Sequence, residues 1–466
     1  MPTLTAAAGL ILGGRAAAQT FKTLHSFDNS DGSHVQAGLT ISGNTLYGAA
    51  DSGGIAGNGT VFKVNTDGTG FTNLYGFTAT SGSYSSNSDG ANPDGTLVLS
   101  GATLYGTAYF GGTAGNGTVF KVNTNGTGFT NLHSFAAGSG SFPYNYTNSD
   151  GACPEAGLII SSNILYGTTE KGGSSGLGAV FAVNTDGTGF TNLHSFTGGA
   201  NGDVPEGLLL SGNTLFGMAS GFSSGNGAVF KVNTDGTGFT NLHSFTGKAS
   251  PGGMVLAGNT LYGAAYQGGS AGYGAVFAIN TDGTGFANLY SFTATSGPNR
   301  TNSDGASPAG RVLLSGSTLY GTAYWGGSEG NGTVFAVSTN GTGFAILHCF
   351  TSTNTPNATN SDGASPYAGL LLSGNNLYGT AKWGGGSGYG TMFSLSLSTQ
   401  LTIFRLRTNV LLTWPTNAAG LALQSTTNLV SQAGWTTVSP GPVVVNGQNA
   451  VTNPAASGRK FYRLSN

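Results

Sequence analysis

Seven copies of one unit make up most of the chain, and this repetition limits the folds open to it. A Leu-(Tyr/Phe)-Gly triplet has its aromatic residue at Tyr47, Tyr105, Tyr166, Phe216, Tyr262, Tyr320 and Tyr378. A second anchor follows 14 or 15 residues later, at Phe62, Phe120, Phe181, Phe230, Phe277, Phe335 and Phe393. A third, usually ending His-Ser-Phe, lies another 15 residues on, at Phe77, Phe135, Phe196, Phe245, Phe292 and Phe350. Such tandem units are typical of solenoids and propellers.

The two ends of the repeat array decide between these architectures. The seventh unit lacks the third anchor, and an orphan copy, FKTLHSF at 21–27, stands before the first unit. A ring needs this permutation, because a strand from one terminus then completes the sheet begun at the other and removes an open edge. The sequence therefore predicts an all-β fold: a seven-bladed β-propeller closed by an N-terminal strand.

Each unit predicts four short antiparallel strands, which together make one propeller blade. In the first unit we expect them at 39–42, 45–50, 60–65 and 71–77, with two-residue turns such as Gly43-Asn44 between them. The innermost strand is apolar, as in Leu158-Ile159-Ile160, and we expect neighbouring blades to cover both its faces.

Loop length separates the two faces of the expected ring. The links between units vary, with 17 to 31 residues from a third anchor to the next triplet aromatic, whereas the hairpins within units are short and constant. The links and the Gly-Gly loops after the second strand emerge on one side, which we call the long-loop face. Variable loops on a constant scaffold are where binding usually resides, so we expect function on this face.

Composition changes at both ends of the array. Residues 6–14 are a short apolar stretch and Ala16-Ala17-Ala18 offers a signal-peptidase site, so we expect a signal peptide at 1–18 and the propeller at 19–397. The tail at 398–466 carries five basic residues and no acidic ones, in short β-branched and aromatic runs separated by Pro, Gly and Asn. This pattern predicts a small β-sandwich.

Charge and cysteine content exclude several classes of protein. Only 7% of residues are charged and the net charge is −2, which argues against nucleic-acid binding and against a polybasic membrane patch. No apolar run approaches the ~20 residues of a transmembrane span. Two cysteines, Cys153 and Cys349, lack zinc-ligand spacing and lie in distant units, so neither a zinc site nor a disulfide is expected. We expect a monomer without a cofactor.

Units such as LYGTAYFGGTAGNGTVFKVNTNGTGFTNLHSF resemble the GloVer tandem repeat of exported proteins from Gloeobacter and Verrucomicrobia, over residues 21–397. The Gly-Gly after the second strand is more distantly similar to Kelch blades, although the Trp of their outer strand is missing. The tail resembles an Ig-like or fibronectin-like module. The resemblance implies a propeller-like fold and a secreted bacterial protein, extracellular, at the cell surface or periplasmic, and it carries over no catalytic residues.

Two repeated polar positions have structural explanations. Five histidines share one outer-strand position with two tyrosines, where we expect them to pack and to hydrogen-bond a neighbouring backbone: His25, Tyr75, His133, His194, His243, Tyr290 and His348. The interblade links share an Asp-Gly, at Asp31, Asp89, Asp150, Asp203, Asp304 and Asp362. An Asx-turn explains it, and repeated Ca²⁺ sites remain the alternative.

The candidate ligand-binding residues are aromatics just before the Gly-Gly loops: Tyr109, Phe110, Tyr266, Tyr324, Trp325 and Trp383. Aromatics at a rim stack on sugar rings while polar loops bond hydroxyls, although packing at blade edges is an equally good explanation. Adjacent residues of a strand point to opposite faces, so one of each pair is free to face solvent.

Binding is favoured over catalysis. The sequence indicates an exported, non-enzymatic protein that recognises a glycan or cell-envelope polymer, or a surface protein. The first alternative is a polysaccharide lyase or hydrolase that uses non-repeating acids, namely Asp94, Glu155, Glu170, Glu206 and Glu329. The second is a structural envelope protein. A sialidase-like site is excluded, because residues 19–397 hold only two arginines, Arg300 and Arg311.

Overall fold

The computed structural model describes residues 20–82, 85–140, 146–222, 226–246, 251–354, 358–397, 401–406, 408–415, 422–427, 434–445, 448–454 and 459–465. The expected signal peptide at 1–18 lies outside the described residues. The chain divides into two compact units, one of residues 21–372 and 377–394, the other of 1–20, 373–376 and 395–466. Each unit is described by itself below.

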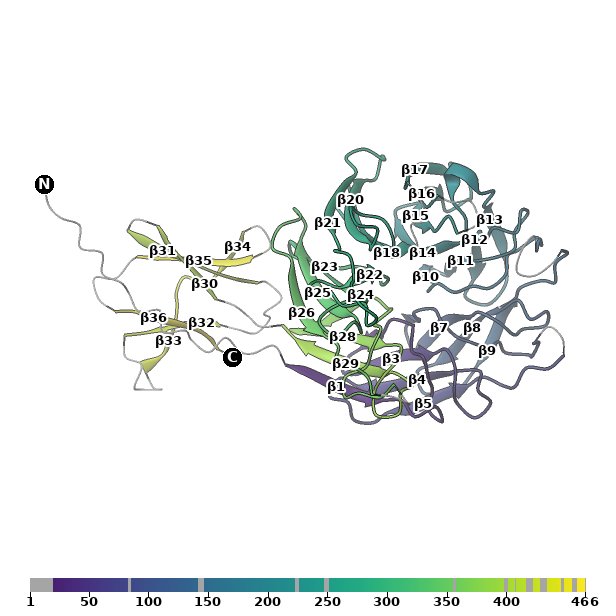
Figure 1. Cartoon of the computed structure of the whole chain (residues 1–466), viewed down its shortest axis with the longest axis horizontal. Coiled ribbons are helices and arrows are strands. Elements are labelled where there is room, and N and C mark those ends of the chain that lie inside the picture. The colour runs from purple at the N-terminus through teal and green to yellow at the C-terminus, as the bar shows by residue number, and fades with distance from the viewer. Residues whose placement is uncertain are drawn as a thin grey trace, which may run out of the picture. The chain divides into compact units, whose positions relative to one another are not determined.

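In the first unit, each sequence repeat forms one antiparallel sheet (Figure 1). The first repeat forms β2 (Thr40–Ser42), β3 (Thr45–Ala50), β4 (Thr60–Asn65) and β5 (Thr72–Gly76), paired in that order. The second and third form β6 (Val98–Ser100), β7 (Thr103–Ala108), β8 (Thr118–Asn123), β9 (Thr130–Ser134), and β10 (Ile159–Ser161), β11 (Ile164–Thr169), β12 (Ala179–Asn184), β13 (Thr191–Ser195).

The next three repeats follow the same plan. They form β14 (Pro205–Ser211), β15 (Thr214–Ala219), β16 (Ala228–Asn233), β17 (Thr240–Ser244); β18 (Pro251–Ala257), β19 (Thr260–Ala265), β20 (Ala275–Asn280), β21 (Ala287–Ser291); and β22 (Ala306–Pro308), β23 (Leu313–Ser315), β24 (Thr318–Trp325), β25 (Thr333–Ser338), β26 (Ala345–Cys349). In the sixth repeat, β22 and β23 both pair with β24. The predicted strands of the first repeat agree with the observed ones to within a residue at each end.

The last sheet is built from both ends of the chain. Its strands are β27 (Leu371–Ser373), β28 (Asn376–Ala381), β29 (Thr391–Ser396) and β1 (Phe21–Ser26), in that order. Figure 1 shows purple β1 beside green β29. The Phe27 amide donates to the Gly390 carbonyl at 3.1 Å. The orphan N-terminal copy thus supplies the strand that the seventh repeat lacks.

The first two sequence anchors pack on each other. Gly48 of the first Leu-Tyr-Gly lies opposite Phe62 in the β3–β4 register. A Cβ on Gly48 would lie 2.5 Å from the Phe62 ring, so any larger residue would displace that ring. The same glycine lies under the same phenylalanine in every repeat, from Gly106 and Phe120 to Gly379 and Phe393. The regular spacing between the first and second anchors therefore reflects one packing contact.

The core lies between successive sheets. One buried cluster joins Phe135 of the second repeat to Leu165 and Phe181 of the third. Another joins Tyr378 and Met392 of the last sheet to the first repeat, from Leu39 to Val64. Apolar contact between the faces of consecutive four-stranded sheets gives the first unit an all-β, propeller-like fold.

The innermost strands are covered on both faces, as expected, but they are not fully buried. Ile159 packs against a cluster that includes Leu208 of the fourth repeat, and Ile160 against one that includes Tyr105 of the second. Every described residue of β10 is half-buried, whereas five of the six residues of β11 are buried. The inner strands are only three residues long in most repeats, and residues along them line a cavity that all seven repeats share. The free edge of an inner strand therefore meets open space, while its two faces contact the neighbouring sheets.

The second unit consists of two antiparallel sheets. One has the order β30 (Thr402–Leu406), β31 (Asn409–Pro415), β35 (Gln448–Pro454), β34 (Val443–Val445), and the other β33 (Thr436–Thr437), β32 (Ala422–Thr426), β36 (Phe461–Ser465). Trp414, Leu412, Leu423, Val438 and Val451 form a buried cluster from both sheets. The helical content of the described residues is one 3₁₀ turn, Gly199–Asn201, and none of their helices could cross a membrane.

Candidate functional site

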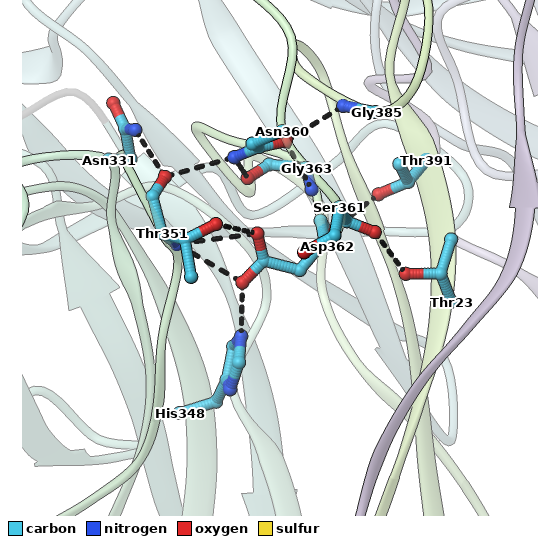
Figure 2. A network of polar contacts seen from close by, with 10 residues as sticks. All are labelled: Thr23, Asn331, His348, Thr351, Asn360, Ser361, Asp362, Gly363, Gly385 and Thr391. Atoms are coloured by element: carbon cyan, nitrogen blue, oxygen red, sulfur yellow. Dashed lines mark hydrogen bonds and ion pairs between the residues drawn. The ribbon is translucent and has the colours of Figure 1, made fainter. Parts of the chain in front are cut away.

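A polar joint connects five of the sheets to the next on the long-loop face, and Figure 2 shows it between the sixth and seventh repeats. His348 Nε2 donates to Asp362 Oδ2 at 2.9 Å, and the Thr351 amide donates to the same oxygen at 3.1 Å. The Thr351 hydroxyl donates to the other carboxylate oxygen. Burial raises the pKa of Asp362, but these hydrogen bonds outweigh it and hold the pKa below its usual value.

The joint recurs with two kinds of donor. His25 and His133 bond to Asp31 and Asp150 at 2.7 and 2.9 Å. In the repeats that carry tyrosine, the Tyr75 hydroxyl donates to Asp89 at 2.7 Å and the Tyr290 hydroxyl donates to Asp304 at 2.8 Å. The expectation of a backbone partner for this position is wrong: the acceptor is the aspartate of the interblade link.

Each ring of this outer position also stacks on a phenylalanine of the following repeat. Centroid separations are 3.7 to 3.9 Å, for His25–Phe71, Tyr75–Phe129, His133–Phe190, His194–Phe239, His243–Phe286, Tyr290–Phe344 and His348–Phe21. One side chain thus combines a hydrogen bond within its own link and a stack on the neighbour, which explains why only His and Tyr occupy the position.

The rest of the Asn-Ser-Asp-Gly motif fixes the link. Asn360 Nδ2 donates to the carbonyls of Thr351 and Gly363, and its Oδ1 accepts from the amides of Gly363 and Gly385 at 2.9 Å (Figure 2). Asn87, Asn148 and Asn302 make the same contacts. These oxygens are occupied by protein donors, and no group of three or more His, Cys, Asp or Glu suited to a metal ion exists among the described residues.

A different set of residues surrounds a cavity of about 520 Å³ on the axis of the repeats. Each repeat contributes one residue to the set. In five repeats this is the link residue four positions before the inner strand, and in the fourth and fifth repeats the equivalent residue is the second of a longer strand. Unlike the joint, this position differs from repeat to repeat: Gln36, Asp94, Glu155, Glu206, Gly252, Ala309 and Tyr367. All of them outside the fifth repeat line the cavity, to which that repeat contributes Gly253. Three consecutive repeats thus supply carboxyl groups, and the last supplies an aromatic hydroxyl. We call this set the channel ring.

The carboxyl groups of the channel ring interact with one another. Burial, with the nearby charge of Glu170 next in effect, raises the pKa of Glu155 to about 7. Burial, with Glu155 next in effect, holds the pKa of Glu206 well above its usual value. Burial and the charge of Asp51 do the same for Asp94. All three side chains are only part-exposed and line the cavity, so their protons are held where a ligand would enter.

A second tier lies at the ends of the second strands, next to the ring. Lys382 Nζ donates to Gln36 Oε1 at 2.9 Å, and Gln36 Nε2 donates to Asp94 Oδ1 at 3.2 Å. On the other side, the Tyr109 hydroxyl donates to Glu170, and the Lys171 ammonium pairs with Glu170 at 2.8 Å.

The remaining part of the second tier is aromatic. Tyr324 meets Tyr367 edge to face, with ring centroids 5.8 Å apart, and Tyr266 lies 6.3 Å from Tyr324. Glycine and alanine stand at the ring positions of these repeats, 252 and 309. Tyr367 lines the same cavity as the three carboxyl groups. Burial raises the pKa of Tyr367, and the charges of Glu155, Glu206 and Asp94 raise it further.

The structure divides the six predicted binding residues into two groups. Tyr109, Tyr266 and Tyr324 lie in the second tier beside the channel ring. Phe110 and Trp383 belong to bridges with the incoming link, and Trp325 lies under the Arg300 guanidinium, 4.6 Å from the ring centroid. Trp383 is 38% exposed and packs edge to face on His34 at 4.2 Å. In each aromatic pair, therefore, the first residue lies beside the channel ring and the second points to the outer surface.

The acids named from the sequence also separate. Asp94, Glu155 and Glu206 line the cavity with Glu170 beside them, whereas Glu329 is exposed in a Gly-Gly loop. Sequence reasoning missed Gln36, Tyr367 and Lys382. The signal was present: most ring residues follow the proline that ends the link, so aligning the repeats on that proline would have identified the ring. The two cysteines are free, and burial raises the pKa of the Cys153 thiol.

Comparison with known proteins gives one family match. A family model described as a Gloeobacter/Verrucomicrobia repeat matches residues 5–147, 141–302 and 246–435. No curated protein sequence matches the chain.

Similar solved structures exist at low identity. An oligogalacturonate lyase from Vibrio parahaemolyticus is 11% identical, with 81% of this chain and 97% of that chain covered and a TM-score of 0.48. A puromycin-hydrolyzing peptidase from Mycobacterium tuberculosis is 11% identical, with 86% and 62% covered and a TM-score of 0.49. The computationally designed Ika8 protein is 15% identical, with 79% and 98% covered and a TM-score of 0.44. Likenesses at this level carry no information on function.

Proposed function

Because this chain belongs to the Gloeobacter/Verrucomicrobia repeat family, we propose that it is an exported bacterial binding protein built on a seven-bladed β-propeller at 19–397. Residues 1–18 are its signal peptide, and 398–466 form an Ig-like or fibronectin-like β-sandwich. It acts without catalysis, as a monomer, and recognises a glycan or cell-envelope polymer through its long-loop face.

The channel ring is the observation that carries this proposal. A position that is equivalent in every repeat holds amide, carboxyl, aromatic and small side chains in turn, around one cavity of about 520 Å³. A purely structural ring would repeat its residue, as the His/Tyr joint does. Concave sites that combine aromatic surface with a few convergent polar groups are typical of small-molecule and sugar binding.

The outer aromatics extend the site. Trp383 and Tyr324 belong to adjacent repeats, and their carbon faces can stack on sugar rings. A polymer offers the same epitope many times, so weak contacts at the ring and at the rim add by effective concentration.

A polysaccharide array, followed by titration of each ligand found, tests the proposal. We expect Tyr324→Ala and Trp383→Ala to weaken binding, by about tenfold for a lost aromatic contact of ~1.4 kcal/mol. Phe404→Ala is the matched control, because Phe404 is a 50% exposed aromatic residue in the second unit. Equal affinity of all three variants would contradict binding at the long-loop face. An array without any ligand would favour a surface-protein partner or a structural role in the envelope.

A polysaccharide-cleaving enzyme is the second candidate, and the carboxyl groups favour it. Glu155, with a pKa of about 7, suits a general acid, and Glu170 beside it is bonded by Tyr109 and Lys171. Two carboxyl groups with different environments are what glycoside cleavage uses. Product formation that Glu155→Gln abolishes, and that Glu329→Gln leaves intact, would establish this alternative over binding alone.

A further inference from the structure

The chemistry of the cavity specifies its ligand further. We propose that the channel ring binds a protonated amine, so that the polymer recognised carries free amino groups, as a non-acetylated amino sugar does. This inference rests on the proposed glycan-binding function and adds the charge of the ligand to it.

The carboxyl side of the ring lacks a matching cation. Asp94, Glu155 and Glu206 line the cavity, and the one basic residue of the lining is Arg311, two residues beyond its own ring position and farther along the channel. Lys171 pairs with Glu170, and Lys382 donates to the neutral Gln36. Both ammonium groups lower the pKa of Glu155 from a distance, but neither forms an ion pair with it in the described part of the chain. Among the described residues, Glu155 and Glu206 have no hydrogen-bond donor of their own. An ammonium group has three N–H donors and no acceptor, which suits two or three such carboxyl groups.

The opposite side of the ring suits the same group. Tyr266, Tyr324 and Tyr367 belong to three successive repeats, and the edge-to-face contact of Tyr324 and Tyr367 leaves their ring planes 87° apart. Perpendicular aromatic faces next to carboxylates are the arrangement that binds ammonium ligands, through attraction to the ring quadrupole. An acetylated amine offers neither the charge nor the third donor, and would leave the carboxyl groups desolvated without compensation.

Electrostatics disfavours the ionised forms of the ring carboxyl groups and shows what a bound cation would change. Enclosure and mutual repulsion favour the neutral forms of these acids, whose pKa values are raised. The facing charges are Asp51, Glu170, Lys171, Lys382 and Arg311. An ammonium ion between the carboxyl groups favours their ionised forms, so binding must release protons from the protein near neutral pH.

The test compares a β-1,4-linked glucosamine hexamer with its fully N-acetylated counterpart, titrated calorimetrically into the full chain at pH 7. We expect the amine hexamer to bind at least about tenfold more tightly, since hydrogen bonds to charged groups are roughly twice as strong as neutral ones. Titration in two buffers of different ionisation enthalpy gives the net proton exchange, and the wild type should release more protons, or take up fewer, than Glu206→Gln, since uptake by the amine is common to both. Glu206→Gln should weaken the amine hexamer about tenfold, whereas Glu329→Gln, a surface exchange of the same kind, should not.

Tyr367→Phe and Tyr367→Leu provide the second pair of variants. We expect the phenylalanine variant to keep most of the affinity because it keeps the ring face, and the leucine variant to lose it. Melting temperatures of all variants identify any that fail to fold.

Each alternative result has a distinct meaning. Equal binding of both hexamers, weakened by Tyr324→Ala, would overturn the amine inference and leave the glycan-binding function standing. Binding of the amine hexamer with the same affinity to Glu206→Gln and Glu329→Gln would overturn it too, as unspecific attraction to an acidic protein. Failure of both hexamers together with an empty polysaccharide array would overturn both proposals.

Discussion

The joint between sheets allows a quantitative test. Other repeats of the chain already carry tyrosine in place of the histidine, and one repeat keeps the histidine without the aspartate. Replacing His348 by Phe keeps an aromatic ring for the stack on Phe21 but removes the donor to Asp362. Replacing it by Tyr keeps both, since Tyr75 and Tyr290 make the same bond in their own repeats.

The expected loss follows from the burial of the pair. The side chains of His348 and Asp362 are 18% and 7% exposed, so water cannot replace the missing donor well. A hydrogen bond to a charged group contributes about 1.5 to 3 kcal/mol. Asp362 keeps the amide and hydroxyl of Thr351, so we expect the lower part of that range, about 2 kcal/mol. His348→Tyr should stay within about 0.5 kcal/mol of the wild type.

Urea titrations of the full chain measure the free energy of unfolding of the three proteins. His243→Phe is the control: His243 stacks on Phe286 in the same way, but its link lacks the Asp-Gly, and no described residue bonds its ring. This variant should be nearly neutral. The pH dependence adds a check. The folded pKa of Asp362 is lowered, so its contribution is fully present above the usual value of 3.8 and is lost as the pH falls below it.

The reasoning would be refuted by equal stability of the Phe and Tyr variants at position 348, or by an equal loss for His243→Phe. Either result would show that the stack alone fixes the residue, and that the aspartate of the link is incidental.

Three further perturbations test other parts of the argument. Gly379→Ala should lower the free energy of unfolding by about 2 kcal/mol or more, because its Cβ would lie 2.5 Å from the Phe393 ring. Gly76→Ala is the control and should be neutral, because the space around Gly76 is open. Equal melting temperatures of the two variants would contradict the packing. Asn360→Ala should lower the free energy of unfolding by about 2 to 3 kcal/mol, since four backbone groups lose their partner, and a change below 0.5 kcal/mol would show that water replaces them. Glu155→Gln should be more stable than the wild type at pH 8 but not at pH 4. The reason is that a carboxyl group whose pKa rises to about 7 on folding destabilises the folded state as the pH rises from 4.5 to 7. The same difference in free energy of unfolding at both pH values, measured with urea, would contradict this.

Sequence periodicity anticipated the strands, because it rests on contacts within a repeat. Gly48 and Phe62 are separated by one hairpin, and the number of residues between such partners is the same in six copies and one fewer in the fourth. The partner of the outer histidine could not be found this way. His25 and Asp31 are 6 residues apart, whereas His133 and Asp150 are 17 apart, because the link between them varies in length.

The candidate site was predicted in part for a related reason. Alternation along a strand indicated that one residue of each aromatic pair faces away from the other, and Tyr109 and Phe110 do so. That Glu155 and Glu206 face one cavity depends on how separate sheets align around it, which no single repeat encodes. The half-exposure of the inner strands has the same origin. Apolar residues such as Ile159 indicated burial, and neighbouring sheets do cover them, but the free edge of the strand lines a cavity that all the repeats form together.

The shared last sheet has a consequence for the order in which the protein can form. Ser26 emerges from the ribosome early, yet it bonds the Gly386 amide, 360 residues later in the chain. The sheets of the first six repeats can assemble from neighbouring segments as they are made, but the final one requires the longest loop closure of the molecule. Until that closure, β1 and β29 each lack their partner, and the growing protein exposes two strand edges with unpaired backbone groups. The chain is thus most vulnerable to association with other copies just before it is complete.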